Sequence, residues 1–372
     1  MQFFTAIAAI SALVAPALAL PTQELPQAPT NQTLHVRLIP TGNTMVKAVV
    51  TNNGDRPLNL LKFNTIMDEN PTAKVNVVHE DGEEVEFTGM LPRYSMRSLP
   101  KSVFTRLAPK DSVEHVFDIA TVHNLKRSGK YTLSARGAVP VAEGDDTAII
   151  DHVYYQSNDL TMEIDARKAA LIPRAFEDTH FAGTLNRRGG LNSTCSPRRY
   201  QVIKRALNDA RMIASSASKA VSSNPEKFRE FFGTTDPNAM KQVSERLMAI
   251  AQASVENGPI KWHCFDSRGR CEQNVVAYTL PSRNEVFPCM PFFTESDFTN
   301  KCHAQDKPTT LIHEAAHNPS VVQPFCRDHG YGYDHVSRLP PRLALQNADN
   351  YSIYAQGKFH LHLPLKVVFS PN

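Results

Sequence analysis

The pattern of apolar and polar residues changes its period halfway along the chain. From residue 33 to about residue 165, short runs of alternating or β-branched residues are separated by turns rich in Gly, Asn, Asp and Pro. This pattern is typical of β-strands. We expect strands in residues 34–40, 45–52, 74–80, 83–89, 113–120 and 129–137. Several short strands at this spacing predict an antiparallel β-sandwich.

The second half has the period of amphipathic helices. A helix is expected over residues 197–223, where apolar residues recur three or four positions apart. These residues are Val202, Ala206, Ala210, Ile213 and Ala217. Another helix is expected over residues 236–257, with Asp236 as its N-cap. Residues 260–289 favour β-hairpins. The whole pattern predicts an α+β protein, with a β-sandwich-like region followed by a mainly helical region that has a small β-hairpin.

Composition describes an ordinary globular protein, but the N-terminus indicates export. Apolar residues make up 41% of the 372 residues, and the net charge of +3 favours neither nucleic acid nor a membrane as a partner. Residues 1–19 form an apolar stretch ending in Ala17-Leu18-Ala19, which is typical of a cleaved signal peptide. No later segment approaches the ~20 apolar residues that span a bilayer. We expect a secreted, extracellular monomer.

Cysteine placement divides the exported chain into two regions. All six cysteines lie in the second half, and an even number in an exported chain indicates disulfides. Shortly before the first of them, Arg187-Arg188 precedes two glycines, which is typical of a site that processing proteases cut. We therefore expect residues 20–188 to be a β-rich propeptide and residues 189–372 to be the mature protein. Residues 189–372 contain 21 Lys and Arg against 16 Asp and Glu, net +5, which leaves −2 for the rest.

The segment HEAAH, residues 313–317, carries the candidate chemistry. It lies in a helix that we expect to begin near Asp306. Residues four apart share one helix face, so His313 and His317 can bind one Zn²⁺ ion. Glu314 can reach a zinc-bound water, whose pKa the metal lowers to around 7, and pass its proton to the leaving amine. This chemistry is peptide hydrolysis; the alternative is an ordinary helix with one solvated and one buried histidine.

A catalytic zinc needs a third protein ligand, and the sequence narrows the choice. The metzincin motif HExxHxxGxxH is absent, since Ser320 and Gln323 stand at its Gly and His positions. No glutamate follows Glu314, which excludes the ligand set of thermolysin. The remaining candidates include Cys326, Asp328, His329, Asp334, His335, Asp349, His360 and His362.

A second motif points to one of these candidates. HEAAH followed by DHGYG, residues 328–332, matches HExxH followed by D-x-x-Y-G, and this pair resembles the deuterolysin family of fungal secreted zinc proteases, the aspzincins. The similarity extends over residues 195–355. The glycines at 330 and 332 permit a tight turn that can bring Asp328 back towards the helix. The resemblance implies a helical metalloprotease domain with one catalytic zinc, whose ligands are His313, His317 and Asp328, with Glu314 and Tyr331 as catalytic residues.

Two features of the site stay open in the sequence. Asp349 is a rival ligand, or a carboxylate that orients a zinc-binding histidine. The late cysteine that Cys302 would pair with in the family is absent, and the chain after Ala355 does not match. Cys326 either pairs with Cys302 or, as a free thiol, competes for zinc. The resemblance implies the disulfides Cys195–Cys264 and Cys271–Cys289.

The predicted function leaves substrate and regulation to be considered. The resemblance implies protein or peptide substrates, with a preference for basic proteins that a mature net charge of +5 does not favour. The propeptide lacks cysteine, so we expect it to act as inhibitor and folding aid by covering the cleft, without a thiol on zinc. Asn31, Asn192 and Asn350 begin N-glycosylation sequons. Alternatives are a catalytically impaired secreted pseudoprotease of the same fold and an uncut β-sandwich binding protein.

Overall fold

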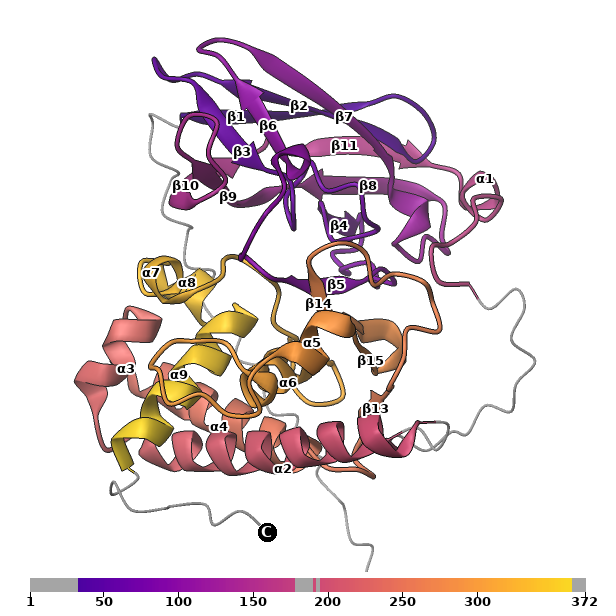
Figure 1. The fold of residues 1–372 in the computed structure, drawn as a ribbon. Helices are drawn as coiled ribbons and strands as arrows, with labels where there is room; N and C mark the ends of the chain where they lie inside the picture. Colours follow the sequence, from indigo (N-terminus) through magenta and orange to yellow (C-terminus); the bar gives the residue numbers. More distant parts are fainter. Residues whose placement is uncertain (1–32, 178–189, 192–194, 363–372) are drawn as a thin grey trace, which may run out of the picture. The chain divides into compact units, whose positions relative to one another are not determined.

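The computed structural model describes residues 33–177, 190–191 and 195–362 (Figure 1). The predicted signal peptide, the Arg187-Arg188 pair and the sequons at Asn31 and Asn192 lie outside these residues. Within them both α-helices and β-strands occur, as the mixed pattern of the sequence predicts. No described helix combines the length and the hydropathy that a membrane-spanning segment needs.

The N-terminal region is built from strands that pair in antiparallel ladders. The strands are β1 (Leu34–Pro40), β2 (Met45–Asn52), β3 (Leu58–Leu61), β4 (Asn76–His79), β5 (Leu91–Tyr94), β6 (Phe104–Leu107), β7 (Ser112–Asp118), β8 (Gly129–Ser134), β9 (Arg136–Ala142), β10 (Ile149–Gln156) and β11 (Leu160–Ile164). Short helices η1 (Lys101–Val103), η2 (Ile119–Thr121) and α1 (Ala166–Ala169) connect or follow them. Three sheets have the strand orders β1-β2-β7, β10-β9-β3-β6 and β11-β8-β4.

Alternating side chains explain why these strands form a core. In β1, Leu34, Val36 and Leu38 are buried. β2 runs antiparallel to β1 with Val50 opposite Val36, so the apolar residues of both strands share one face. Strands β3 and β5 were not expected, because they are buried at every position and show no alternation.

One predicted strand is wrong. Residues 83–89 form no strand and make only isolated bridges, between Glu84 and Val78 and between Phe87 and His123. The bridge partner is Val78 at residue 84 and His123 at residue 87, so it changes within three residues. A continuous ladder, which needs one partner strand throughout, therefore cannot form.

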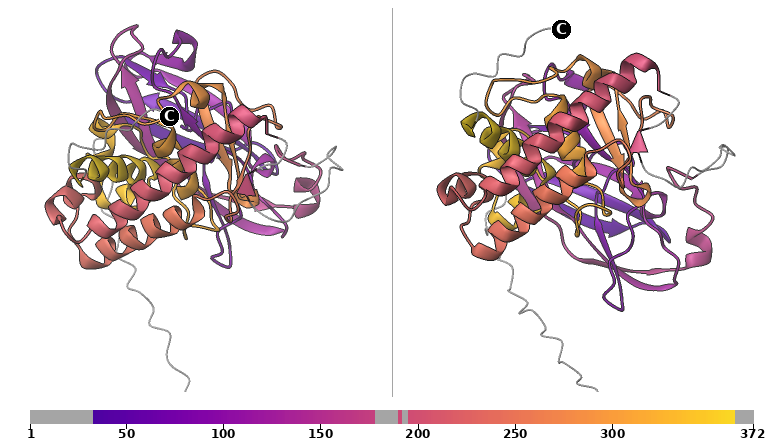
Figure 2. Two further views of the ribbon diagram at one scale, coloured as in Figure 1. Left: turned by 60° about the horizontal axis from the view of Figure 1, so that its bottom comes forward. Right: turned by 90° about the horizontal axis from the view of Figure 1, so that it is seen from below.

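The C-terminal region is mainly helical. Its elements are α2 (Pro197–Ala220), α3 (Pro225–Phe232), α4 (Pro237–Ala253), η3 (Pro281–Arg283), α5 (Met290–Thr294), α6 (Lys307–Ala316), α7 (Tyr333–Val336), α8 (Pro341–Ala344) and α9 (Ala348–His362), with strands β12 (Gly190–Leu191), β13 (Lys261–Trp262), β14 (Val275–Leu280) and β15 (Glu285–Pro288). Helix α2 packs against α4, α6 and α9 (Figure 2). The helices predicted over residues 197–223 and 236–257 are confirmed, although each ends a few residues early. Asp236 caps α4, since its side chain accepts from the Ala239 N–H at 2.9 Å.

One N-terminal strand joins the C-terminal sheet. This sheet has the order β12-β13-β15-β14-β5, in which β5 lies antiparallel to β14 (Figure 1). Met90 and Tyr94 share a buried apolar cluster with Tyr278 and Phe287 of the C-terminal region. β5 therefore pairs with the sheet of the region that carries HEAAH and with none of the three N-terminal sheets.

Candidate metal centre

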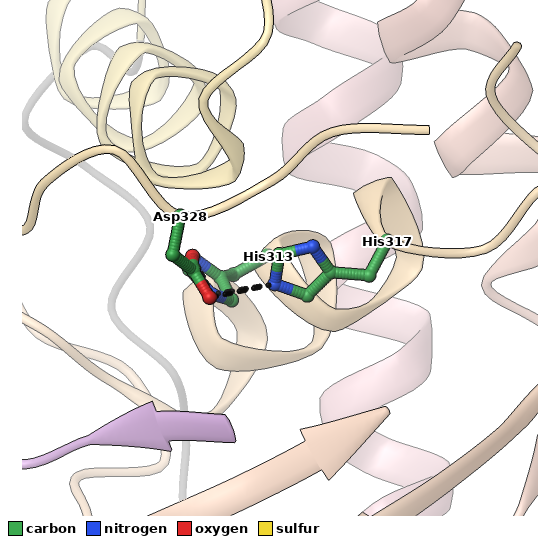
Figure 3. A group of neighbouring side chains, drawn as sticks. All are labelled: His313, His317 and Asp328. Atoms are coloured by element: carbon green, nitrogen blue, oxygen red, sulfur yellow. Dashed lines mark hydrogen bonds and ion pairs between the residues drawn. The ribbon is translucent and has the colours of Figure 1, made fainter. Parts of the chain in front are cut away.

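Helix α6 presents the two histidines of HEAAH and is buried along its whole length. It begins where the sequence predicts because Asp306 caps it. The Asp306 side chain accepts from the Thr309 N–H at 3.0 Å, and Thr309 Oγ1 accepts from the Asp306 N–H at 3.0 Å. His313 and His317 are four residues apart, and their Nε2 atoms lie 3.1 Å from each other (Figure 3).

The segment after α6 brings Asp328 back to this pair. The Cys326 N–H donates to the Ala316 carbonyl at 2.9 Å, which ties this segment to the end of the helix. Asp328 Oδ1 lies 3.2 Å from His313 Nε2, and Oδ2 lies 3.4 Å from His317 Nε2. Burial raises the pKa of Asp328, but the charges of His317 and His313 outweigh burial, and the net shift is downward. Within the described residues, these three form one group able to hold a metal ion.

The glycines of DHGYG fit the turn for different reasons. A Cβ atom on Gly330 would lie 1.7 Å from the His335 ring, so no larger residue can pack there. Gly332 has a φ of +77°, which a residue with a side chain adopts at a cost. The turn also uses Asn347, whose side chain accepts from the His329 N–H at 2.7 Å. The sequence showed the glycines but had no signal for Asn347.

The Nδ1 atoms of His313 and His317 point away from Asp328, and their partners orient both rings. His317 Nδ1 lies 2.8 Å from the Cys326 carbonyl oxygen, and His313 Nδ1 lies 3.3 Å from Asp349 Oδ1. Both of these partners are acceptors, so when a metal ion is bound each Nδ1 can carry the proton while the lone pair of each Nε2 binds the metal. Two lone pairs and a carboxylate at this spacing repel one another unless a cation lies between them.

The distances between the donor atoms fit tetrahedral zinc. Zinc binds imidazole nitrogen and carboxylate oxygen at about 2.0–2.2 Å, which places neighbouring ligand atoms roughly 3.3 Å apart. The corresponding distances are 3.1, 3.2 and 3.4 Å. Asp328 Oδ1 is buried and makes no hydrogen bond within the described part of the chain. The donor set therefore suits Zn²⁺ and leaves one coordination position for water or substrate.

Glu314 lies beside this group and is anchored by the neighbouring strand. Its Oε2 accepts from Thr279 Oγ1 of β14 at 2.6 Å, while its buried Oε1 has no hydrogen-bond partner among the described residues. Burial raises the pKa of Glu314 although His313 and His317 oppose the shift. The arrangement gives the carboxylate one fixed oxygen and one oxygen able to accept a proton. No sequence pattern indicated Thr279 as part of the site.

Tyr331 contributes a half-buried phenol to the same place. Burial, reinforced by the charge of Asp328, raises the pKa of Tyr331 well above its usual value, so the phenol is a hydrogen-bond donor at neutral pH. It donates to the Pro92 carbonyl of β5 at 3.1 Å and is in contact with the Asn64 side-chain amide. Asn64 Nδ2 also donates to Asp328 Oδ2 at 3.3 Å. No sequence pattern identified these N-terminal residues as neighbours of the site.

Asp349, the rival ligand, lies behind His313 instead of between the histidines. Its Oδ2 accepts from the Gly332 N–H at 2.7 Å, and its Oδ1 receives a hydrogen bond from Arg93 at 2.6 Å as well as facing His313 Nδ1. Burial acts to raise the pKa of Asp349, but Arg93 and His313 outweigh it and lower that pKa. The position suits a carboxylate that orients a metal-binding imidazole.

The cysteines resolve into two pairs and two free thiols. Disulfides join Cys195 to Cys264 and Cys271 to Cys289. Cys302 is free and exposed, and Cys326 is free and buried, so the alternative of a bond between them does not occur in this structure. Burial raises the pKa of Cys326 to about 12, which keeps the thiol protonated and disfavours zinc binding.

The other sequence candidates lie outside the group. Cys326, His329, Asp334 and His335 supply no atom to it. The side chains of His360 and His362 lie outside the described part. Asn350 is fully buried, and its Nδ2 donates to the Phe231 carbonyl at 2.6 Å, so the folded protein has no room for a glycan there.

Comparison with known proteins identifies the family of this chain. The profile of the Deuterolysin metalloprotease (M35) family matches residues 1–363. A neutral protease 2 homolog of Trichophyton verrucosum is 54% identical over 99% of both chains, and a probable neutral protease 2 homolog of Arthroderma otae is 55% identical over 95% of both. A solved zinc peptidase from Grifola frondosa matches 44% of this chain and 96% of its own, with 18% identity and a TM-score of 0.36. The chain therefore belongs to the deuterolysin metalloprotease (M35) family and is a zinc-dependent metalloendopeptidase.

Proposed function

We propose that this chain is the preproenzyme of a secreted zinc endopeptidase, with residues 1–19 as signal peptide, 20–188 as propeptide and 189–372 as the protease. His313, His317 and Asp328 hold the zinc. The observation that carries this proposal is the set of three donor atoms at tetrahedral spacing, next to one carboxylate and one phenol. The alternative of an impaired pseudoprotease is not favoured, because each of the expected polar groups is present and directed to the same place.

The chain's own groups account for the movement of protons during peptide hydrolysis. The zinc ion, when bound, polarises the substrate carbonyl and lowers the pKa of water. Glu314 takes a proton from the attacking water on its Oε1 and delivers it to the leaving nitrogen, while Thr279 holds Oε2. Tyr331 donates its phenolic proton as a hydrogen bond to the oxygen on which charge develops. The proposal includes a preference for basic proteins, which the net charge of +5 on the mature half opposes.

The proposed function is tested by proteolysis with metal control. The processed secreted protein should cleave casein, lose this activity with a zinc chelator and regain it when Zn²⁺ is restored. N-terminal sequencing of the secreted protein should begin near Gly189. A protein that binds zinc at His313 but cleaves neither casein nor histone would contradict the proposal, as would secretion of an uncut chain as the working form.

Removing the Tyr331 phenol should slow catalysis without removing zinc. We expect Tyr331→Phe to reduce kcat by on the order of 10²–10³, because a donor to the oxyanion is lost while the three ligands stay in place. Steady-state kinetics and metal analysis of the processed enzyme measure both effects. Tyr200→Phe is the control, since its phenol donates to Glu256 instead. A Tyr331→Phe enzyme with wild-type kcat would show that Tyr331 only packs against its neighbours.

Acid should weaken the contact between the propeptide and the protease. His152 of β10 stacks on His335 of α7 with ring centroids 3.3 Å apart. Burial, together with the charge of His335 and of Arg338, lowers the pKa of His152 to about 3, and burial also lowers the pKa of His335, against the charges of Asp349 and Asp151. Protonation is thus favoured in the separated parts, whose histidines have a pKa near 6.5. The contribution of these two histidines to association is fully present above that pH and is lost as the pH falls towards 3.

This pH dependence is measurable on the chain cut after Arg188. The dissociation constant of propeptide and protease, from analytical ultracentrifugation, should rise by up to about tenfold per pH unit below 6.5 for each histidine. His152→Gln should flatten this dependence between pH 6.5 and 5. A His152→Gln complex that follows the wild-type pH profile would contradict the role of this pair.

A further inference from the structure

The edge of β14 is where β5 binds, and it runs past the proposed catalytic residues. In the order β12-β13-β15-β14-β5, removal of β5 leaves β14 as an edge strand. An edge strand offers free N–H and C=O groups and binds an extended peptide as an additional strand. Thr279 of β14 pairs with Leu91 and also holds Glu314. β5 therefore occupies a surface suited to a peptide substrate.

The peptide group between Pro92 and Arg93 lies at the catalytic side chains. The Pro92 carbonyl oxygen accepts hydrogen bonds from the Tyr331 phenol at 3.1 Å and from Asn64 Nδ2 at 2.8 Å. The same Asn64 amide donates to Asp328 at 3.3 Å. One amide group thus fills the space between the carbonyl and a metal ligand. Water has to reach that space to attack the carbonyl carbon. The Pro92–Arg93 peptide bond therefore binds at the site but is protected from hydrolysis.

Arg93 extends from this peptide into a buried acidic pocket. Its side chain is 4% exposed, and its guanidinium donates to Asp349 Oδ1 at 2.6 Å. Glu295 is a second carboxyl group that acts on Arg93, although burial raises the pKa of Glu295 to about 7, and it accepts a hydrogen bond from Thr310 Oγ1 at 3.0 Å. A cavity of about 570 Å³ adjoins Arg93 and Asp349 and is lined also by Tyr331, Gln305 and Gln356. A buried cation is costly unless opposite charge faces it, and here it does.

We propose that β5 is a pseudosubstrate of the protease, held by Arg93 in the pocket of Asp349 and by the Tyr331 phenol at the Pro92 carbonyl. This inference rests on the proposed function and names how the propeptide blocks the site. β5 pairs with the edge of β14, accepts the hydrogen bond of the Tyr331 phenol and fills the pocket behind His313 with the Arg93 side chain. Arg93 donates to the same Oδ1 of Asp349 that faces His313 Nδ1. Release of the propeptide therefore leaves this oxygen to interact with His313 alone.

The first experiment measures latency in the full chain. Arg187→Gln and Arg188→Gln keep the chain uncut, and cleavage of a short fluorogenic peptide reports access to the site. Adding Arg93→Met should raise activity by roughly 100-fold, because the ion pair is lost and the charge of Asp349 is left buried without its cation. Arg93→Lys should retain most of the latency. Arg97→Met, an exposed position three residues beyond β5, is the matched control and should leave activity unchanged.

The second experiment does not depend on folding of the variants. A synthetic peptide of residues 88–97 is added to the processed wild-type enzyme, and inhibition is measured. The peptide should raise KM without changing kcat, and the same peptide with Arg93→Met should inhibit at least tenfold more weakly. Equal inhibition by both peptides, or none up to about 1 mM, would overturn the proposal. The proposal would also be overturned if the uncut, folded Arg93→Met chain cleaved the fluorogenic peptide no faster than the uncut chain with Arg93.

The outcomes separate this inference from the proposed function. Zinc-dependent cleavage of the fluorogenic peptide by the processed wild-type enzyme is established first. If that cleavage is missing, the proposed function fails. If it is present and Arg93 has no influence on latency or on peptide inhibition, the function stands and only the pseudosubstrate is wrong.

Discussion

Asp328→Ala should leave a folded protease that no longer retains zinc. Removal of the carboxylate leaves two imidazoles, and zinc in proteins needs at least three protein ligands for a stable catalytic site. The loss of zinc affinity should exceed the 10–100-fold that loss of an outer partner costs. Metal analysis after dialysis measures the zinc, and casein cleavage should fall with it.

Two controls make this result specific. Asp334→Asn changes a nearby acidic residue that supplies no donor atom to the group, and it should keep full zinc. Asp349→Asn should weaken zinc binding by 10–100-fold, as expected for a carboxylate that orients His313. A folded Asp328→Ala protein with stoichiometric zinc and full activity, together with loss of zinc in Asp349→Asn, would reverse the two assignments.

Glu314→Gln should separate catalysis from metal binding. Glutamine has the same shape and can still bond to Thr279, so the buried environment is preserved, but it cannot accept the proton of the attacking water. We expect kcat to fall by about 10²–10⁴ with zinc content unchanged. Kinetics and metal analysis of the processed enzyme measure both quantities.

A surface variant gives the baseline for this experiment. Glu226→Gln removes a carboxylate at the exposed start of α3 and should leave kcat unchanged. If Glu314→Gln retained kcat within a few-fold of wild type, another group would have to move the proton. Loss of zinc in Glu314→Gln would instead assign Glu314 a role in holding the metal group together.

Local rules predicted the part of the site that lies within one helix. The spacing of His313 and His317, the cap at Asp306 and the end of the helix all follow from contacts between residues at most five apart. These contacts form in any context that buries the helix, so sequence periodicity is sufficient to find them. The third zinc ligand did not follow from local rules. Residue chemistry left eight candidates, and only the family motif favoured Asp328.

The N-terminal region shows where periodicity stops being informative. β1 and β2 alternate because one of their faces is buried, and both were predicted. β5 is buried at all four positions, Tyr94 among residues of the C-terminal half and Leu91 beside Phe87 and Val122, so it shows no alternation. Residues 83–89 do alternate, but they have no continuous partner and form no strand.

The sequence by itself determined the chemistry available to this protein: two imidazoles on one helical face, a carboxylate between them in the chain, a turn with two glycines, and cysteines confined to one half. Only the tertiary structure decided how these groups are used. It placed Asp349 behind His313, anchored Glu314 through Thr279, left Cys302 and Cys326 apart, and brought β5 to the edge of β14. Arg93 and Asp349 are 256 residues apart, and no local propensity links them. Their contact depends on sheet pairing and burial, which act only once the chain has folded.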